Sequence, residues 1–120
     1  MRKETGSWLA QAKDDLDGAE FNFQGRRYSI AAFLCQQAIE KALKALLIET
    51  TASFPKIHDL TKLAKLSKAP ANIVRLCSRV SPAYTASRYP DSPKQYSKED
   101  CEKLLAESKV ILKWIEEKLG

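Results

Sequence analysis

The placement of proline most constrains how this chain folds, because proline interrupts a helix wherever it stands inside one. All five prolines of the 120-residue sequence lie between residues 55 and 93. On either side of that window apolar residues recur at three- and four-residue steps, and the alternation typical of strands is absent throughout. The sequence therefore predicts an all-α protein with long helices outside the window and shorter ones within it.

Start and stop signals divide the chain into helices. Thr5 or Ser7 is expected to cap the first helix. Asp59 and Ser97 are expected to cap the third and the last, because their side chains accept hydrogen bonds from free backbone N–H groups. We expect residues 1–120 to form one domain, an antiparallel four- to five-helix up-and-down bundle with the short connections usual in such folds. The expected helices cover about residues 7–24, 29–49, 60–69, 71–80 and 98–119.

The second of these helices is expected to lie at the centre of the bundle, because half of its circumference carries no polar residue. The other half mixes polar side chains with large apolar ones, a composition that suggests a protein–protein contact. We therefore predict that this face contributes to the two-fold interface of a homodimer. Its residues are Phe33, Gln37, Lys41, Lys44, Leu47 and Ile48.

The positive charge is unevenly distributed along the chain. The net charge is +5, and residues 51–100 hold nine basic and four acidic side chains, whereas the remaining segments are balanced. A cluster of this kind favours a polyanionic partner such as nucleic acid or a nucleotide phosphate. The alternative is an ordinary basic surface that serves solubility.

Residue usage argues against several kinds of site. Three cysteines without a C-x-x-C pair and a single histidine make a disulfide framework or a zinc site unexpected. The four scattered glycines form no phosphate-binding loop. The N-terminus lacks the apolar core of a secretory signal, and charged residues interrupt the longest apolar run. We therefore expect a cytoplasmic protein that needs no metal, cofactor or membrane.

The stretch "TASRYPDSPKQY" belongs to a segment, residues 81–97, that is too long for a helix connection. It holds three of the four tyrosines, namely Tyr84, Tyr89 and Tyr96, and disordered segments are poor in aromatic residues. Two prolines lower the entropy of ordering it. We predict an ordered loop that folds back onto the bundle and brings Arg88 near His58.

The candidate ligand-binding residues combine cations for a phosphate with polar and aromatic side chains for a base or ribose. His58 and Arg88 are the central pair, since histidine readily exchanges a proton near neutral pH and arginine is a forked donor. The alternatives are a local hydrogen bond for His58 and a structural ion pair for Arg88 with Asp91 or a carboxylate of the first helix. The full set is Lys41, Lys44, His58, Asp59, Arg88, Tyr89 and Asp91.

Several segments in this order resemble the HEPN family (higher eukaryotes and prokaryotes nucleotide-binding domain). They are Trp8-Leu9 with Ala12, Asp15, Leu16 and Ala19, then "YSIAAFLCQQAIEKALKALL", "HDL" at 58–60, "SRYPD" at 87–91, and Trp114 near the end. The resemblance implies an antiparallel helical bundle, commonly dimeric. It also implies a partner, a minimal nucleotidyltransferase, with which such domains often form toxin–antitoxin pairs.

One branch of the family is a metal-independent ribonuclease with an arginine and a histidine four to six residues apart. This chain departs from that pattern: Thr51, Ala52 and Ser53 stand upstream of His58, and Pro93, Lys94 and Gln95 stand downstream of Arg88. We therefore expect a nucleotide- or RNA-binding accessory subunit without catalytic residues of its own. The alternatives are a ribonuclease toxin that uses His58 and Arg88, and an interaction bundle without a ligand.

Overall fold

The computed structural model describes residues 1–91 and 95–120, and Pro93, part of the predicted loop, falls outside them. The described residues form helices and connections and contain no strand. None of these helices combines the length and apolarity needed to cross a bilayer, as judged over the same residues. The helices are α1 (Lys3–Gln24), α2 (Tyr28–Thr51), α3 (Leu60–Leu66), α4 (Ala71–Val80), α5 (Ala83–Ala86) and α6 (Lys98–Leu119).

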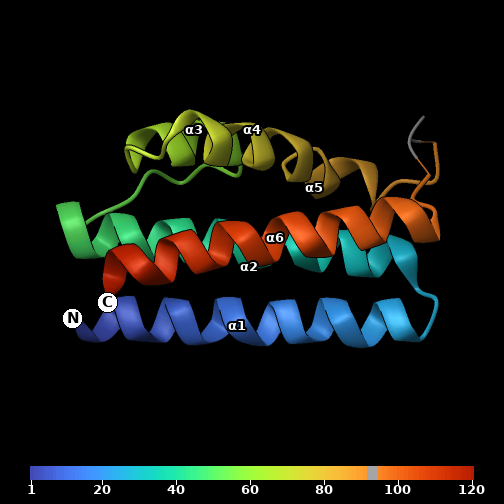
Figure 1. Cartoon of the computed structure of the whole chain (residues 1–120), viewed down its shortest axis with the longest axis horizontal. Helices are drawn as coiled ribbons and strands as arrows, with labels where there is room; N and C mark the ends of the chain where they lie inside the picture. The colour runs from blue at the N-terminus through green and yellow to red at the C-terminus, as the bar shows by residue number, and fades with distance from the viewer. Residues whose placement is uncertain (92–94) are drawn as a thin grey trace.

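The three long helices lie side by side and the three short ones cover them (Figure 1). The chain runs along α1 and returns along α2. In the third leg it advances along the connection after α2, doubles back along α3, whose start lies beside the end of α4, and advances again along α4 and α5 (Figure 1). It then returns along α6, so that both termini lie at one end (Figure 1). The predicted antiparallel up-and-down bundle is confirmed. The third leg is divided into short helices because Pro70 and Pro82 stand at their starts. One of them, α5, lies inside the segment that was predicted to be entirely loop.

Two of the predicted caps are present and one prediction was wrong. The Asp59 carboxylate accepts hydrogen bonds from the N–H groups of Thr61 and Lys62 at the start of α3. Ser97 and the residue three positions on form a reciprocal capping box at the start of α6. The first helix, however, begins at Lys3, because the Thr5 hydroxyl is buried and donates to the Glu49 carboxylate instead of capping.

The core surrounds α2, as the sequence predicted. Ile39 and Leu43 of α2 are fully buried, together with Ile111 and Ile115 of α6. Truncation of such a side chain to alanine typically costs about 2–5 kcal/mol of stability. Leu66, the last residue of α3, is 53% exposed, whereas Leu60 and Leu63 of the same helix are fully buried.

The second face of α2, predicted to form a dimer interface, is largely covered by the protein's own chain. Lys44, Leu47 and Ile48 are at most 5% exposed. Lys41 is half-buried against α1, where its ammonium group lies 2.6 Å from the Asp15 carboxylate. Lys44, Leu47 and Ile48 are therefore not available to a second subunit, whereas Phe33, Gln37 and Lys41 are half-buried, and the prediction that this face contributes to a dimer interface stays a prediction.

The three cysteines should resist alkylation in the native protein. Cys35, Cys77 and Cys101 are all buried, and burial raises the pKa of the Cys35 and Cys77 thiols to about 12. At pH 8 roughly one such thiol in ten thousand is a thiolate, the form that reacts. We expect mass spectrometry to show almost no maleimide adduct on native protein and three adducts in denaturant. Rapid labelling of any thiol in the native protein would contradict the packing.

Candidate functional site

Three side chains from two separate segments meet at α5. His58 precedes α3, Tyr84 belongs to α5, and Arg88 follows it. The imidazole of His58 stacks on the Tyr84 ring with 4.2 Å between centroids and 13° between planes. The guanidinium carbon of Arg88 lies 4.4 Å from the same Tyr84 centroid. The structure thus brings His58 and Arg88 onto one aromatic ring, and we call these three residues the stacked triad.

Aromatic rings surround Arg88. Besides Tyr84, the rings of Phe33 and Tyr89 each lie with their centroids 5.4 Å from its guanidinium carbon. Within the described part of the chain, no carboxylate forms an ion pair with Arg88, so the predicted alternative of a structural pair with Asp91 or an α1 carboxylate is not found there. Contacts with ring faces leave the N–H donors of a guanidinium available for an anion.

A row of polar side chains on α2 supports His58 from inside the bundle. Its Nδ1 atom lies 3.0 and 3.1 Å from the two carboxylate oxygens of Glu40. Glu40 also accepts from Lys44 Nζ at 3.0 Å and from Gln36 Nε2 at 3.1 Å. Gln36 is fully buried, and Glu40 and Lys44 are each 5% exposed. We call Gln36, Glu40 and Lys44 the buried polar row.

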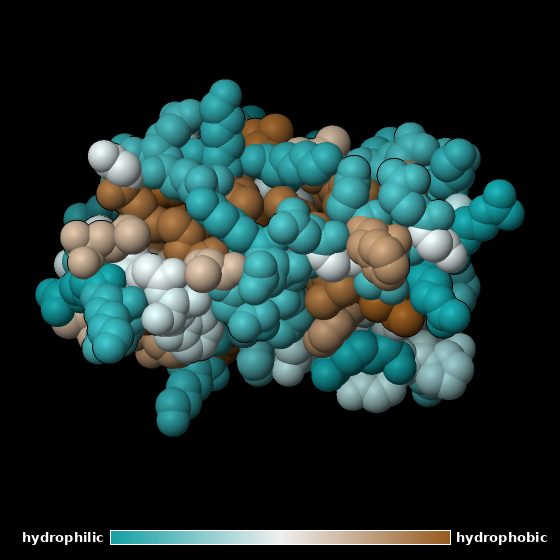
Figure 2. Space-filling model, turned by 90° about the horizontal axis from the view of Figure 1, so that it is seen from below, coloured by the Kyte–Doolittle hydropathy of each residue, from teal (hydrophilic) through white to brown (hydrophobic). Residues whose placement is uncertain are grey.

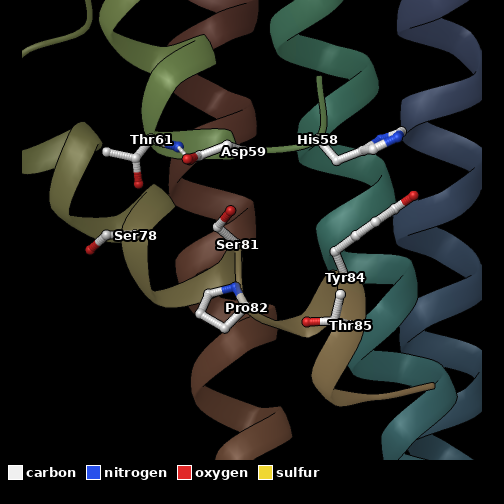
Figure 3. Close-up of a pocket in the computed structure, with 8 residues that line it drawn as sticks. All are labelled: His58, Asp59, Thr61, Ser78, Ser81, Pro82, Tyr84 and Thr85. Atoms are coloured by element: carbon white, nitrogen blue, oxygen red, sulfur yellow. Dashed lines mark hydrogen bonds between the residues drawn. The ribbon is translucent and has the colours of Figure 1, made fainter. Parts of the chain in front are cut away.

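An open hollow of about 420 Å³ adjoins the stacked triad (Figure 3). That volume lies within the range of small-molecule sites. Hydroxyl groups from three segments line it, and one of them, Ser81 Oγ, accepts a hydrogen bond from the Leu60 N–H and ties the end of α4 to the start of α3. The lining consists of His58, Asp59, Thr61, Ser78, Ser81, Pro82, Tyr84 and Thr85.

The predicted ligand-binding residues fall into two groups. His58, Arg88 and Tyr89 come together around Tyr84, and Asp59 lines the adjoining hollow while capping α3. Lys44 is buried in α2, where its ammonium group forms an ion pair with Glu40.

The other two predicted residues lie apart from this group. Lys41 pairs with Asp15 and lines a separate cleft with Trp8 on the α1 side. Asp91 is exposed, and the described contacts of the stacked triad do not include it.

Sequence reasoning missed Glu40 and Gln36, although a signal was present. Positions 36, 40 and 44 are each four residues apart, so they lie along one stripe of α2. A polar stripe on a helix predicted to be central can indicate polar partners inside the protein as readily as solvent. The second missed role is that of Phe33, which was assigned to a dimer contact but lies beside Arg88 and Tyr84.

Three solved structures are similar to this chain over nearly its whole length. The chain is 27% identical to TT1696 from Thermus thermophilus, with a TM-score of 0.88 over 98% of this chain and 99% of that one. It is 30% identical to ST0689, an archaeal HEPN homologue, with a TM-score of 0.83 over both full chains. A HEPN domain protein from Thermotoga maritima is 25% identical, with a TM-score of 0.76 over 94% and 97% of the two chains.

A search of curated protein sequences gives no match. The family model for the HEPN domain, in contrast, matches residues 5–118. The match spans all six helices, including the stacked triad and the buried polar row. The chain therefore belongs to the HEPN domain family.

Proposed function

We propose that this HEPN protein binds a nucleotide or RNA through the stacked triad, as the accessory subunit of a minimal nucleotidyltransferase in a cytoplasmic toxin–antitoxin-like pair. One observation carries the ligand part of the proposal. An exposed arginine is held by aromatic rings, without an ion pair among the described residues, beside an exposed histidine and an open hollow. Such an arginine is preorganised for phosphate.

Each part of a nucleotide has a matching group around the triad. Arg88 suits a phosphate, because a guanidinium donates two parallel hydrogen bonds to it. Tyr89 is 52% exposed and offers a ring face on which a base can stack, a contact worth about 1–3 kcal/mol per base. The hydroxyl groups of Ser81 and Thr85 in the hollow suit a ribose.

Family membership supports the partners in the proposal, a second copy of the chain and a minimal nucleotidyltransferase. The face seen from the α1 side is mainly hydrophilic, with separated apolar patches (Figure 2). The exposed large apolar residues include Phe21, Ile30 and Val110, and these are further candidates for subunit contacts. Sedimentation tests the dimer, and co-purification with a nucleotidyltransferase encoded by a neighbouring reading frame tests the second partner.

Binding should weaken as salt rises. Two phosphate contacts to a single-stranded RNA would reduce the affinity roughly sevenfold between 50 and 200 mM salt, because bound cations are released from the RNA. We expect fluorescence anisotropy with a short labelled RNA, and competition by ATP, to show this dependence. Absence of binding by either ligand at 50 mM salt would contradict the proposal and favour an interaction bundle.

A second candidate function, the metal-independent ribonuclease, is favoured by one observation. General acid–base catalysis by histidine needs an oriented ring, and both carboxylate oxygens of Glu40 lie within hydrogen-bond distance of His58 Nδ1. The same labelled RNA distinguishes the two functions. Cleavage in the presence of a chelator, abolished by His58→Ala, supports the ribonuclease, whereas intact bound RNA supports the accessory subunit.

A further inference from the structure

We infer that Glu40 is a positioning residue for His58, which holds the imidazole with its proton on Nδ1 and thereby presents Nε2 to a ligand. The effect on a ligand rests on the proposed function, whereas the effect on the ring does not. The starting observation is chemical. An ionised carboxylate only accepts hydrogen bonds, so a nitrogen bonded to it must carry a proton.

The contacts of Glu40 show that its carboxylate is directed at His58 as well as at Lys44. Its Oε1 atom accepts from Gln36 Nε2 and lies 3.0 Å from His58 Nδ1. Its Oε2 atom accepts from Lys44 Nζ and lies 3.1 Å from the same nitrogen. The groups that Gln36 and Lys44 direct at this carboxylate are hydrogen-bond donors. Neither residue therefore offers His58 Nδ1 an acceptor in place of Glu40.

The histidine is fixed at two further points. The His58 carbonyl accepts a hydrogen bond from Gln36 Nε2 at 3.0 Å, which ties the backbone to the buried polar row. The ring face is covered by Tyr84. Since Nδ1 is turned toward a buried carboxylate while 49% of the side chain is exposed, Nε2 is the ring nitrogen left for a ligand. In neutral histidine with Nδ1 protonated, that nitrogen is an acceptor.

Lys44 stabilises this arrangement inside the protein. A buried carboxylate without a counter-charge is strongly unfavourable. Lys44 is buried with it, and its ammonium group lies 5.2 Å from the centroid of the Phe54 ring, which in turn packs edge-on against Trp8. Lys44 therefore compensates the Glu40 charge, while both carboxylate oxygens stay within 3.1 Å of the imidazole Nδ1.

The single histidine allows a direct spectroscopic test on the full chain. In protein labelled with ¹⁵N-histidine, long-range ¹H–¹⁵N spectra recorded at alkaline pH report which nitrogen carries the proton. We expect the Nδ1–H pattern in the wild type, the tautomer that free histidine disfavours. Glu40→Gln supplies an amide donor in place of one acceptor oxygen, so the pattern should shift toward Nε2–H.

Asp15→Asn is the matched control. It removes one carboxylate charge of an ion pair with Lys41, the residue next to Glu40 on α2, and leaves the contacts of His58 unchanged. It should keep the wild-type pattern. If Glu40→Gln does not fold, the double variant Glu40→Gln/Lys44→Met, which removes both buried charges, replaces it. A wild type without the Nδ1–H pattern, or a folded Glu40 variant that retains it, overturns the inference.

RNA binding separates this inference from the proposed function. Glu40→Gln should weaken binding about fivefold, the value of one neutral hydrogen bond, although Arg88 is unchanged. A shifted tautomer with unchanged affinity overturns the ligand-facing role of Nε2. If the wild type binds neither RNA nor ATP, the proposed function fails, and the spectra alone then decide whether Glu40 positions the ring.

Discussion

Replacing Arg88 with alanine is expected to weaken binding of a short single-stranded RNA by about 10- to 100-fold without unfolding the protein. Hydrogen bonds to a charged group contribute about 1.5–3 kcal/mol, and Arg88 supplies the only guanidinium of the stacked triad. Its cation–π contacts are exposed and worth little to stability, roughly 0.5–1 kcal/mol each. Anisotropy titration at low salt measures the affinity, and thermal unfolding measures the stability.

Two variants make this result interpretable. Lys118→Ala removes the same charge from the end of α6, away from α5, and should leave the affinity unchanged (Figure 1). Arg88→Lys keeps the charge but loses the forked donor, so its affinity should lie between those of the wild type and Arg88→Ala. If Arg88→Ala unfolds part of the protein while the folded fraction binds RNA normally, Arg88 stabilises the fold and the ligand site lies elsewhere.

Replacing Lys44 with methionine should lower the free energy of unfolding by about 3 kcal/mol. Breaking a buried ion pair by removing one partner typically costs about 3–5 kcal/mol, because the other charge is left without compensation. We expect the lower end of that range, since Gln36 and His58 still contact the Glu40 carboxylate. Urea denaturation followed by circular dichroism gives the difference.

The double variant Glu40→Gln/Lys44→Met should recover most of the loss, because no uncompensated charge remains. Asp15→Asn breaks the more exposed pair with Lys41 and should cost about 1 kcal/mol. A Lys44→Met cost no larger than that of Asp15→Asn would mean that water reaches Glu40, which is incompatible with the burial of the row.

The helices could be predicted from the sequence because their signals are local. Prolines, capping residues such as Asp59 and Ser97, and apolar periodicity act within a few positions, and the bundle follows from them. The burial of Lys44 was not predictable in the same way. A polar stripe on a helix has the same periodicity whether it faces water or a neighbouring segment, so the burial of Gln36, Glu40 and Lys44 on the polar face of α2 was missed.

The candidate site was likewise predicted only in part from the sequence. The proximity of Arg88 and His58 was predicted, because both lie where helical regularity breaks and only a fold-back of the loop could join them. The pairing of His58 with Glu40 spans 18 positions, and no local pattern connects them. This pairing depends on how α3 packs against α2, and tertiary packing cannot be read from local sequence propensity.

The division of the third leg into short helices has a consequence for ligand response. Helices of seven, ten and four residues are too short to persist alone, so α3, α4 and α5 exist through their docking on α2 and α6. We therefore expect local opening of this leg to cost less free energy than global unfolding, so that hydrogen exchange shows its amides as a less protected unit. Along the sequence, His58 precedes the first helix of the leg and Arg88 follows the last, and both contact Tyr84. A ligand bound by both residues would therefore link the start of this segment to its end. It would disfavour local opening and slow the exchange of amides that it does not contact.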